Sequence, residues 1–454
     1  MRKIHIVTFG CQMNKLDSEL AAEALVDAGH VMVDDENDAD TVVFNTCSVR
    51  DHAEQRVLSR LAQLRPRRLA DSDFRLGMMG CFAERDGREL LERLPYLDFA
   101  LGTRQFLRLP EVLERLDVEA GKAGFFGEAA REQPGIDQAH ERLRHQGIQG
   151  FVSVMRGCDN RCSYCIVPDV RGGEISRRAA DIAAEVKALA LAGAREVTLL
   201  GQNIDAYGKH DGGSLAGLLR LIDREAPPET GLMRIRFVTS HPRDINRELV
   251  ETVAVIPRVC RHFHMPAQSG SDTVLERMRR GYGRGEYDAK LAMIRDIIPD
   301  ASIASDFIVG FPGESESDYL ATRDLVEKAQ FQNSFIFKYS PRPGTPAALQ
   351  LPDNVPDIEK RRRNNDLLAV QNRVNEKRAA EQVGRRVVVM AEGVSSRDSR
   401  RWTGRTDGNQ ICVFPVHAGE GDVAAGQLLE LVVESATPLT LYCRRMENSH
   451  DLKP

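Results

Sequence analysis

Hydrophobic and polar positions alternate with a mixed period over the first hundred residues of the chain. Short β-rich runs are each followed by an amphipathic helical stretch, which is the pattern of a parallel α/β sheet. The expected strands are 4–10, 41–45 and 75–80, and the expected helices are 16–28, 52–64 and 84–94. The pattern predicts an N-terminal doubly wound parallel-sheet domain at residues 1–120.

A polar segment without apolar periodicity follows, and it predicts a linker at residues 121–147. A second βα series then begins. Its expected strands are 151–155, 195–200, 233–238, 261–265, 302–309 and 333–339, with amphipathic stretches at 181–192, 215–225 and 286–298. Six βα steps suit a partial barrel better than the complete eight-unit barrel. We therefore expect a central (β/α)6 core at residues 148–378.

The pattern changes again after a charged helix near 357–382. Short β runs follow at 386–391, 410–416, 427–434 and 438–443, with glycines and Thr/Asp turns between them. Several short strands separated by such turns are typical of a small all-β barrel. The sequence predicts this third domain at residues 379–446, so the fold class is α/β with a C-terminal β-barrel.

Composition narrows the functional classes. Hydrophobic residues make up 42 % of the 454 positions and charged residues 28 %, as in ordinary globular proteins. The formal net charge of −5 means that any nucleic-acid site must be a local basic patch. The start, MRKIHIVTFG, lacks the apolar stretch of a signal peptide, and no run of about 18 apolar residues occurs anywhere. We expect a soluble cytoplasmic protein with no membrane partner.

The nine cysteines are odd in number and too few for a disulfide scaffold of this size. Cys158, Cys162 and Cys165 form a C-x3-C-x2-C triplet directly after the first strand of the predicted core. Three thiolates from one loop can hold three irons of a cubane and leave the fourth iron open. Zinc would need a fourth ligand, and no other Cys or His lies in the forty residues that follow. The polar residues within the triplet also disfavour three packing cysteines, so an iron–sulfur site is favoured over zinc.

Three more cysteines share a different pattern, since each lies at or just beyond the carboxyl end of a predicted strand: Cys11, Cys47 and Cys81. These ends line one edge of an open parallel sheet, so residues far apart in sequence can meet there. Together they could hold a second cubane with an open iron. Buried packing thiols are the alternative, because free cysteine is among the most buried residue types. The remaining cysteines lack such equivalence and are expected to pack in cores: Cys260, Cys412 and Cys443.

The triplet at 158–165, with Tyr164 just before its last cysteine, resembles the signature of radical S-adenosylmethionine enzymes. The resemblance implies that the methionine moiety chelates the open iron and that an electron from the cluster cleaves the sulfonium to a 5′-deoxyadenosyl radical. It also implies contacts with S-adenosylmethionine near Tyr164, Gly201, Gln202 and Asp306. A glycine that ends a strand is often simply a turn, which is the alternative for Gly201.

Two three-cysteine sites followed by a small barrel resemble the methylthiotransferase family over nearly the whole chain. That family has an N-terminal three-cysteine domain, a radical core and a nucleic-acid-binding barrel of the TRAM type. The stretches that carry the resemblance are GCQMNKLDSE at 10–19, NTCSVRDHAEQRV at 45–57, HPRD at 241–244, PAQSGSDTVLERMRRGY at 266–282, DFIVGFPGES at 306–315 and YSPRPGTPA at 339–347. The first two look like the branch that acts on isopentenylated adenosine, because the ribosomal-protein branch typically has Pro-Lys-Asn after the first cysteine.

The resemblance implies methylthiolation of C2 of N6-isopentenyladenosine at adenosine-37, 3′ of the tRNA anticodon. One S-adenosylmethionine would give the methyl group and another the radical, with sulfur carried on an auxiliary 4Fe–4S cluster at Cys11, Cys47 and Cys81. The second 4Fe–4S cluster would bind at Cys158, Cys162 and Cys165. No catalytic side chain is assigned beyond these ligands. A low-potential electron donor is implied, and we expect a monomer.

The tRNA anticodon stem-loop needs a basic docking surface, and its single-stranded loop makes it cheap to turn a base outward. Three groups of arginines are candidates: Arg56, Arg60, Arg65, Arg67 and Arg68; Arg277, Arg279, Arg280 and Arg284; and Arg397, Arg400, Arg401 and Arg405 around Trp402. Cationic and aromatic side chains can bind backbone and base. Acidic residues such as Asp398 and Asp407 interleave, so solvated charged faces are the alternative.

Two other functions stay open. A sister enzyme acting on threonylcarbamoyladenosine in tRNA or on a ribosomal protein is the nearer one, and a non-catalytic iron–sulfur carrier is the more distant one. Asp169 and Val170 depart from the family pattern, where an aromatic residue or threonine is common. Cleavage of S-adenosylmethionine by the reduced protein separates an enzyme from a carrier.

Overall fold

The computed structural model describes the whole chain except residues 49–50, 120, 128–146, 417–422 and 446–454. Most of the predicted linker at 121–147 therefore lies outside the described residues. The chain forms two compact units. The first contains Met1–His145 together with Phe151–Asn160 and Cys165–Ile175, and the second contains most of the remaining chain.

The first unit is built on a six-stranded parallel sheet with the strand order β2-β1-β3-β4-β5-β6. Its strands are β1 (Lys3–Phe9), β2 (Val31–Met32), β3 (Thr41–Thr46), β4 (Arg75–Met79), β5 (Phe99–Leu101) and β6 (Ala123–Phe125). Its helices are α1 (Gln12–Asp27), α2 (Asp51–Ala70), α3 (Cys81–Arg93), η1 (Phe106–Arg108) and α4 (Leu109–Val118). The predicted doubly wound sheet is confirmed, and β6 lies within the segment expected to be linker.

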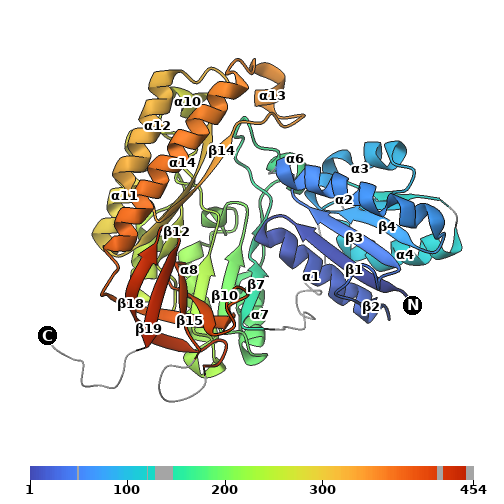
Figure 1. Cartoon of the computed structure of the whole chain (residues 1–454), viewed down its shortest axis with the longest axis horizontal. Coiled ribbons are helices and arrows are strands. Elements are labelled where there is room, and N and C mark those ends of the chain that lie inside the picture. Colours follow the sequence, from blue (N-terminus) through green and yellow to red (C-terminus); the bar gives the residue numbers. More distant parts are fainter. Residues whose placement is uncertain (49–50, 120, 128–146, 417–422, 446–454) are drawn as a thin grey trace. The chain divides into compact units, whose positions relative to one another are not determined.

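Successive side chains of each strand point to opposite faces of the sheet, and buried apolar residues on both faces are covered by helices. Phe44, Leu76 and Met78 on β3 and β4 pack in one buried cluster with Leu61 of α2 and Phe82 of α3. Helix α1 packs instead with α4, and Figure 1 shows these helices along the strands they follow. Because all strands are parallel, the carboxyl ends of β1, β3 and β4 lie at one edge of the sheet.

The second unit contains the parallel strands of an open barrel. They are β10 (Glu196–Leu200), β11 (Arg234–Phe237), β12 (His262–His264), β13 (Ser302–Val309) and β14 (Asn333–Lys338), and β7 (Gln149–Ser153) begins in this unit. Strands β12, β13 and β14 form one sheet, and β10 pairs with β11 in another. The six strands predicted for the partial barrel are present, and they form two three-stranded sheets, β11-β10-β7 and β12-β13-β14.

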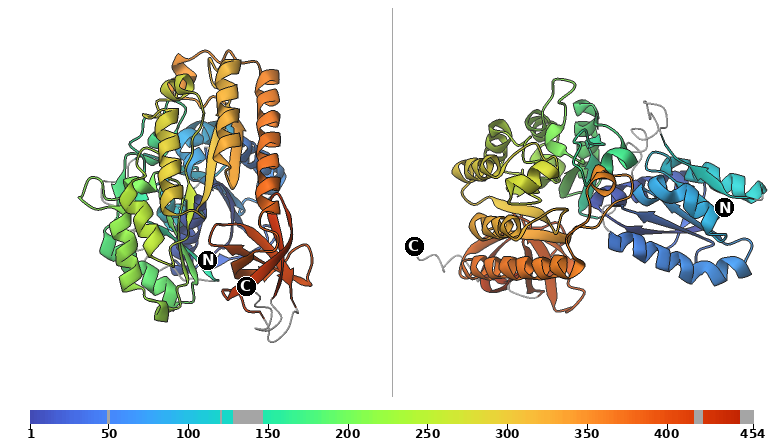
Figure 2. Two further views of the ribbon diagram at one scale, coloured as in Figure 1. Left: turned by 90° about the vertical axis from the view of Figure 1, so that its left-hand side faces the viewer. Right: turned by 90° about the horizontal axis from the view of Figure 1, so that it is seen from above.

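Helices separate these strands and cover their outer side, as Figure 2 shows for the barrel. They are α7 (Ala179–Leu191), η2 (Ile204–Ala206), α8 (Leu215–Glu225), η3 (Pro228–Thr230), α9 (Arg247–Val255), α10 (Asp272–Arg277), α11 (Arg284–Ile297), α12 (Glu316–Ala329), α13 (Pro346–Gln350) and α14 (Asp357–Ala380). Apolar residues on one side of α8, among them Leu218, Leu219 and Ile222, are buried, which is the amphipathic pattern expected for a helix over a sheet.

The C-terminal strands close into a five-stranded barrel with the order β15-β16-β17-β19-β18. They are β15 (Arg386–Val394), β16 (Arg401–Thr406), β17 (Ile411–Pro415), β18 (Leu428–Thr437) and β19 (Thr440–Arg445). Cys412 and Cys443 pack with Phe414 and Leu431 in its core, as predicted, and Cys260 is also buried. The sequence predicted four of these strands and missed β16.

The C-terminal barrel packs against the core within the second unit. The buried guanidinium of Arg234 donates to the backbone oxygens of Arg405 and Val388, and that of Arg236 donates to the oxygen of Asp407. Arg236 also forms an ion pair with Glu196 at 3.1 Å. These buried polar contacts fix the barrel on the core within the second unit.

Candidate iron–sulfur sites

Cys11, Cys47 and Cys81 come together at the carboxyl edge of the first sheet. Cys11 lies between β1 and α1, Cys47 follows β3, and Cys81 begins α3 directly after β4. The backbone N–H of Cys47 donates to the oxygen of Phe9 at 2.9 Å, which joins the ends of β1 and β3. Cys47 and Cys81 are buried and Cys11 is exposed. The predicted convergence of the three strand-end cysteines is therefore present within the first unit.

A network of short polar side chains shapes the wall of this site. The thiol of Cys11 donates to Oδ1 of Asn14 at 3.1 Å, and the amide of Asn14 donates to Asn45 at 2.8 Å. Gly80 has a φ of +93°, and a Cβ there would lie 2.3 Å from Oδ1 of Asn45. A larger residue at this position would displace the asparagines, so glycine is required for the close approach of β4.

One buried cation lies beside these thiols. Nε of Arg171, in α6 (Val167–Arg171), is 3.3 Å from Sγ of Cys81. The same guanidinium pairs with Asp17 at 2.9 Å, and Asp17 also pairs with Arg156 at 3.3 Å. Both Arg171 and Asp17 are almost fully buried. Sequence analysis missed Asp17, Asn14 and Asn45, although two of them lie in the GCQMNKLDSE stretch at 10–19.

The surroundings shift the pKa values of the Cys11 and Cys81 thiols in opposite directions. The hydrogen bond with Cys47 lowers the pKa of Cys11 to about 6, although desolvation of the thiol raises it, and the charge of Arg171 also lowers it. Burial raises the pKa of Cys81, although Arg171 opposes this. A site that stabilises a thiolate is suited to metal binding, because thiolates are the metal ligands.

The three sulfurs fit a cluster better than one ion. Within the described chain, these sulfurs do not all lie within 4.8 Å of one another. A tetrahedral zinc ion, with Zn–S bonds of about 2.3 Å, would draw its sulfur ligands closer together than that. This spacing disfavours a single zinc ion, and the three thiols remain candidate ligands of a cubane.

The second triplet lies in the loop between β8 (Met155–Arg156) and α6. Cys158 and Cys165 belong to the first unit and Cys162 to the second. The N–H of Cys158 donates to the oxygen of Gly172 at 3.0 Å, and Nδ2 of Asn160 donates to its sulfur at 3.5 Å. Gly157 has a φ of +78°, and a Cβ there would be 1.9 Å from the oxygen of Gly173. This backbone turn at the start of the loop requires glycine.

Cys162 is buried beside a second arginine. Nη1 of Arg280 lies 3.3 Å from Sγ of Cys162 and 3.4 Å from the hydroxyl of Tyr164. The neighbouring Ser163 donates from its hydroxyl to the oxygen of Arg277 at 2.7 Å and from its N–H to the oxygen of Met278 at 3.0 Å. The segment after α10 thus fixes this part of the cysteine loop.

The residues predicted to contact S-adenosylmethionine lie directly after β10, inside β13 or in the cysteine loop. Gly201 and Gln202 directly follow β10. The imidazole of His264 donates to Asp306 on β13 at 3.0 Å. The ring of Tyr164 packs edge-on against Phe311, with the ring centroids 6.4 Å apart. Gly201 and Gln202 thus lie at the end of the barrel where such strands carry functional groups, whereas Asp306 lies inside β13.

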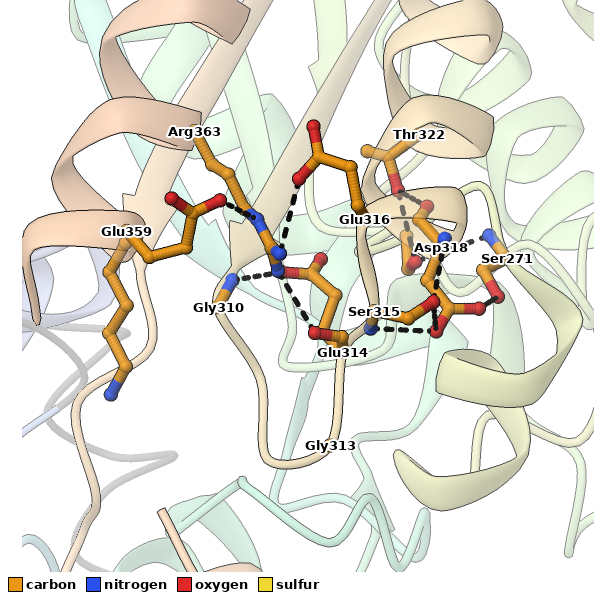
Figure 3. Close-up of polar contacts among 12 residues, drawn as sticks. Ser271, Gly310, Gly313, Glu314, Ser315, Glu316, Asp318, Thr322, Glu359 and Arg363 are labelled. Atoms are coloured by element: carbon orange, nitrogen blue, oxygen red, sulfur yellow. Dashed lines mark hydrogen bonds and ion pairs between the residues drawn. The ribbon is translucent and has the colours of Figure 1, made fainter. Parts of the chain in front are cut away.

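The loop after β13 is fixed by contacts with α14, as Figure 3 shows. Arg363 donates to Oε2 of Glu314 at 2.8 Å and to its backbone oxygen at 3.0 Å. Oε2 of Glu314 also accepts from the N–H of Gly310. The Glu314 side chain is fully buried and that of Arg363 is 6 % exposed. The GFPG segment at 310–313 is thereby fixed at the end of β13.

The predicted basic patches are only partly available for docking. Arg280 is 5 % exposed, so it cannot contact RNA as expected. Arg68 pairs with Asp98 at 2.8 Å, and Arg67 lies over Phe74 at 4.2 Å. On the C-terminal barrel, Arg397, Arg400 and Arg401 are exposed, whereas Trp402 packs partly against the barrel core. A run of arginines in the sequence does not distinguish packed from exposed side chains.

Comparison with known sequences places these sites in a family. The sequence model of the radical SAM superfamily matches residues 152–326, and that of the uncharacterized protein family UPF0004 matches residues 3–102. A tRNA-2-methylthio-N(6)-dimethylallyladenosine synthase of Geobacter sulfurreducens is 45 % identical over 415 residues, covering 90 % of this chain and 91 % of that protein. One of Chlorobium luteolum is 40 % identical over 441 residues, covering 97 % and 96 %. The chain belongs to this synthase family.

Membership of the synthase family confirms the methylthiotransferase resemblance and the radical S-adenosylmethionine core predicted from the second triplet. A further synthase, from Geobacter metallireducens, is 43 % identical and covers 96 % of the chain. These relatives are named for dimethylallyladenosine, so the sister-branch alternative is not favoured. A non-catalytic iron–sulfur carrier is not supported either, since the family consists of enzymes.

Solved structures support the fold of this synthase family member. A radical S-adenosylmethionine methyltransferase, TsrM from Kitasatospora setae, superposes with a TM-score of 0.56 at 15 % identity, covering 77 % of this chain and 74 % of that one. The cobalamin-dependent radical enzyme OxsB gives a TM-score of 0.50 at 12 % identity, covering 82 % and 56 %. At these identities the likeness concerns the fold alone. Among the described helices, none has both the length and the apolar character to cross a membrane.

Proposed function

We propose that this chain methylthiolates C2 of N6-isopentenyladenosine-37 in tRNA, in the cytoplasm. The observation that carries the proposal is the convergence of Cys11, Cys47 and Cys81 at one sheet edge. This site occurs in a chain that resembles dimethylallyladenosine synthases over nearly its full length.

The two triplets are the proposed ligands of two 4Fe–4S clusters. When bound, these clusters would supply an open iron for reductive cleavage of S-adenosylmethionine in the core and an open iron that carries sulfur in the first unit. The chain's own contribution is to position them. Asn14, Asn45 and Gly80 shape the first site. The guanidinium of Arg171 lies beside Cys81 and is fixed there by its ion pair with Asp17.

A radical step suits the chemistry of the substrate. The adenine C2–H bond is neither acidic nor electrophilic enough for general-base chemistry at neutral pH, so a side chain could not replace this hydrogen by sulfur. Tyr164, Gly201, Gln202 and Asp306 are proposed to orient S-adenosylmethionine. A low-potential donor must supply the electron, and we propose that the chain works as a monomer.

Mass spectrometry of nucleosides tests the proposal. The anaerobically reconstituted protein is incubated with S-adenosylmethionine, sulfide, a reductant and one of two tRNAs, carrying either isopentenyladenosine or threonylcarbamoyladenosine. We expect the 2-methylthio product in the first tRNA alone. Product in the second tRNA alone, or on a ribosomal protein in a parallel reaction, would reject the proposed substrate.

The exposed arginines of the C-terminal barrel are expected to bind RNA phosphates. Arg400 is 87 % exposed beside Asp398, and Arg401 and Arg397 are also exposed. Each phosphate contact to single-stranded RNA contributes about 0.7 to the slope of log affinity against log salt. Replacing Arg397, Arg400 and Arg401 with glutamine should weaken tRNA binding and flatten this slope by about 1 to 2.

The control for the barrel arginines is Arg224→Gln, which removes an exposed arginine beside Glu225 on α8. Both proteins are compared by tRNA binding over a series of salt concentrations. Point substitutions are preferable to truncation, because removing the barrel would uncover Arg234 and Arg236. An unchanged slope in the triple variant would assign RNA docking to another surface.

A further inference from the structure

Arg280 is a buried arginine that the proposed RNA docking does not use. It follows α10 in a segment where Arg277 and Arg279 are exposed, while Arg280 itself is 5 % exposed. Its guanidinium donates to the backbone oxygen of Pro266 at 2.9 Å and to the hydroxyl of Tyr282 at 3.1 Å. These bonds fix the side chain within the core of the second unit.

The remaining N–H groups of Arg280 point at the cysteine loop. Nη1 lies 3.3 Å from Sγ of Cys162 and 3.4 Å from the hydroxyl of Tyr164. Arginine is not deprotonated in proteins, so the buried guanidinium of Arg280 is a cation. The side chain therefore keeps its charge beside the sulfur.

No carboxylate neutralises this charge among the described residues, since every contact recorded for Arg280 is with an oxygen of the backbone or of tyrosine, or with sulfur. Arg171 offers the internal comparison. It too lies 3.3 Å from a cysteine sulfur, that of Cys81, but it forms an ion pair with Asp17. Each three-cysteine site thus has one buried guanidinium, and only the one at Cys162 lacks an acidic partner in the described chain.

We propose that Arg280 is a positioning residue whose buried, unneutralised charge raises the reduction potential of the cluster held through Cys162. This inference rests on the proposed function, because it requires a cluster at the second triplet. Adding an electron makes the cluster more negative, so a nearby cation stabilises the reduced state more than the oxidised state. Hydrogen bonds to the ligand sulfurs and local charge are established determinants of such potentials.

The consequence concerns the electron donor. A higher potential allows a weaker reductant to load the electron that cleaves S-adenosylmethionine. At the auxiliary site Asp17 pairs with Arg171 and also with Arg156, so it offsets the charge of Arg171 only in part.

The test is an EPR-monitored redox titration of the reconstituted full-length protein without S-adenosylmethionine. To isolate the core signal, all proteins carry alanine in place of Cys11, Cys47 and Cys81. Arg280→Gln removes the charge but retains an N–H donor, and Arg280→Lys keeps the charge. Arg279→Gln is the matched control, since Arg279 is the adjacent, exposed arginine, and its side chain donates to Gln350.

We expect the equilibrium constant for reduction of the core cluster to be at least tenfold lower in Arg280→Gln. This corresponds to a midpoint potential lower by about 59 mV for a one-electron couple. Arg280→Lys should stay close to the Arg279→Gln control. The inference is overturned if Arg280→Gln and the control have the same midpoint, or if Arg280→Lys falls as far as Arg280→Gln. It is also overturned if the only effect is weaker binding of S-adenosylmethionine, measured separately, because the arginine would then bind the cofactor's carboxylate.

Two further readouts keep the outcomes distinct. Iron and sulfide content is measured for every protein, and absence of a core cluster in the control would reject the proposed function rather than the role of Arg280. Arg280→Met serves as the second neutral variant if Arg280→Gln does not retain iron. We expect Arg280→Met to fold, because the hydroxyl of Tyr282 also donates to the backbone oxygen of Pro266, at 3.2 Å. This buried acceptor therefore keeps a hydrogen bond when the guanidinium is removed.

Discussion

Replacing Cys11, Cys47 and Cys81 with alanine is expected to abolish thiomethyl transfer while 5′-deoxyadenosine is still released. The three thiols belong to the first unit, whereas the barrel strands that should hold S-adenosylmethionine belong to the second. Loss of the auxiliary ligands therefore removes the sulfur carrier and leaves the radical chemistry. Chromatography of 5′-deoxyadenosine and mass spectrometry of tRNA nucleosides measure the two activities in one reaction.

Cys260→Ala is the control for this triple change. Burial raises the pKa of Cys260 to about 12, so its thiol stays protonated and is a packing residue rather than a ligand. The control should retain the iron content and both activities, while the triple variant should lose about half of its iron. Loss of 5′-deoxyadenosine release in a folded triple variant that keeps the core cluster would contradict the separation of roles.

Arg363→Met should cost about 3 to 5 kcal/mol of unfolding free energy, because it leaves the fully buried carboxylate of Glu314 without its cation. Figure 3 shows how Arg363 joins Glu314 to Glu359 and Glu316. Arg362 on the same helix also pairs with Glu359 and Glu316, but its side chain is 47 % exposed. Arg362→Met should therefore cost less than about 1 kcal/mol. Urea unfolding of both variants measures the difference.

The loss in Arg363→Met should depend on pH. Burial already raises the pKa of Glu314, against the effect of Arg363, and removing this arginine raises it further. A carboxyl whose pKa is higher in the folded state costs stability above its unfolded pKa, and the cost disappears as the pH falls. The variant should thus be closer to the wild type at pH 5 than at pH 8. Equal losses at both pH values, or equal losses in the two arginine variants, would contradict the buried ion pair.

The sequence predicted the parts of the molecule that follow from local periodicity. Parallel βα units place successive strand ends at one edge, so the meeting of Cys11, Cys47 and Cys81 followed from their positions alone. Strand β16, RWTGRT, escaped prediction because its charged and small residues conceal the alternation of buried and exposed positions. Its place in the barrel is fixed by pairing with β15 and β17.

The electrostatic surroundings of the two sites could not be predicted in the same way. Asp17 and Arg171 are 154 residues apart in sequence, and only the folded chain brings them together beside Cys81. Arg280 was expected to bind RNA because arginines surround it in sequence, yet its side chain is buried against Cys162. The charge of a residue does not show whether it is buried, since a long cationic side chain can pack inside the protein or extend into solvent.

The most direct test of the central claim follows the hydrogen at C2 of the substrate base. The reconstituted enzyme is given tRNA whose isopentenyladenosine-37 carries deuterium at C2, and mass spectrometry follows both products. The account predicts 2-methylthio-N6-isopentenyladenosine that has lost the deuterium, and 5′-deoxyadenosine that has gained it. Methylthiolated base formed without deuterium in 5′-deoxyadenosine, or 5′-deoxyadenosine released with no change in the base, would contradict radical methylthiolation at this carbon.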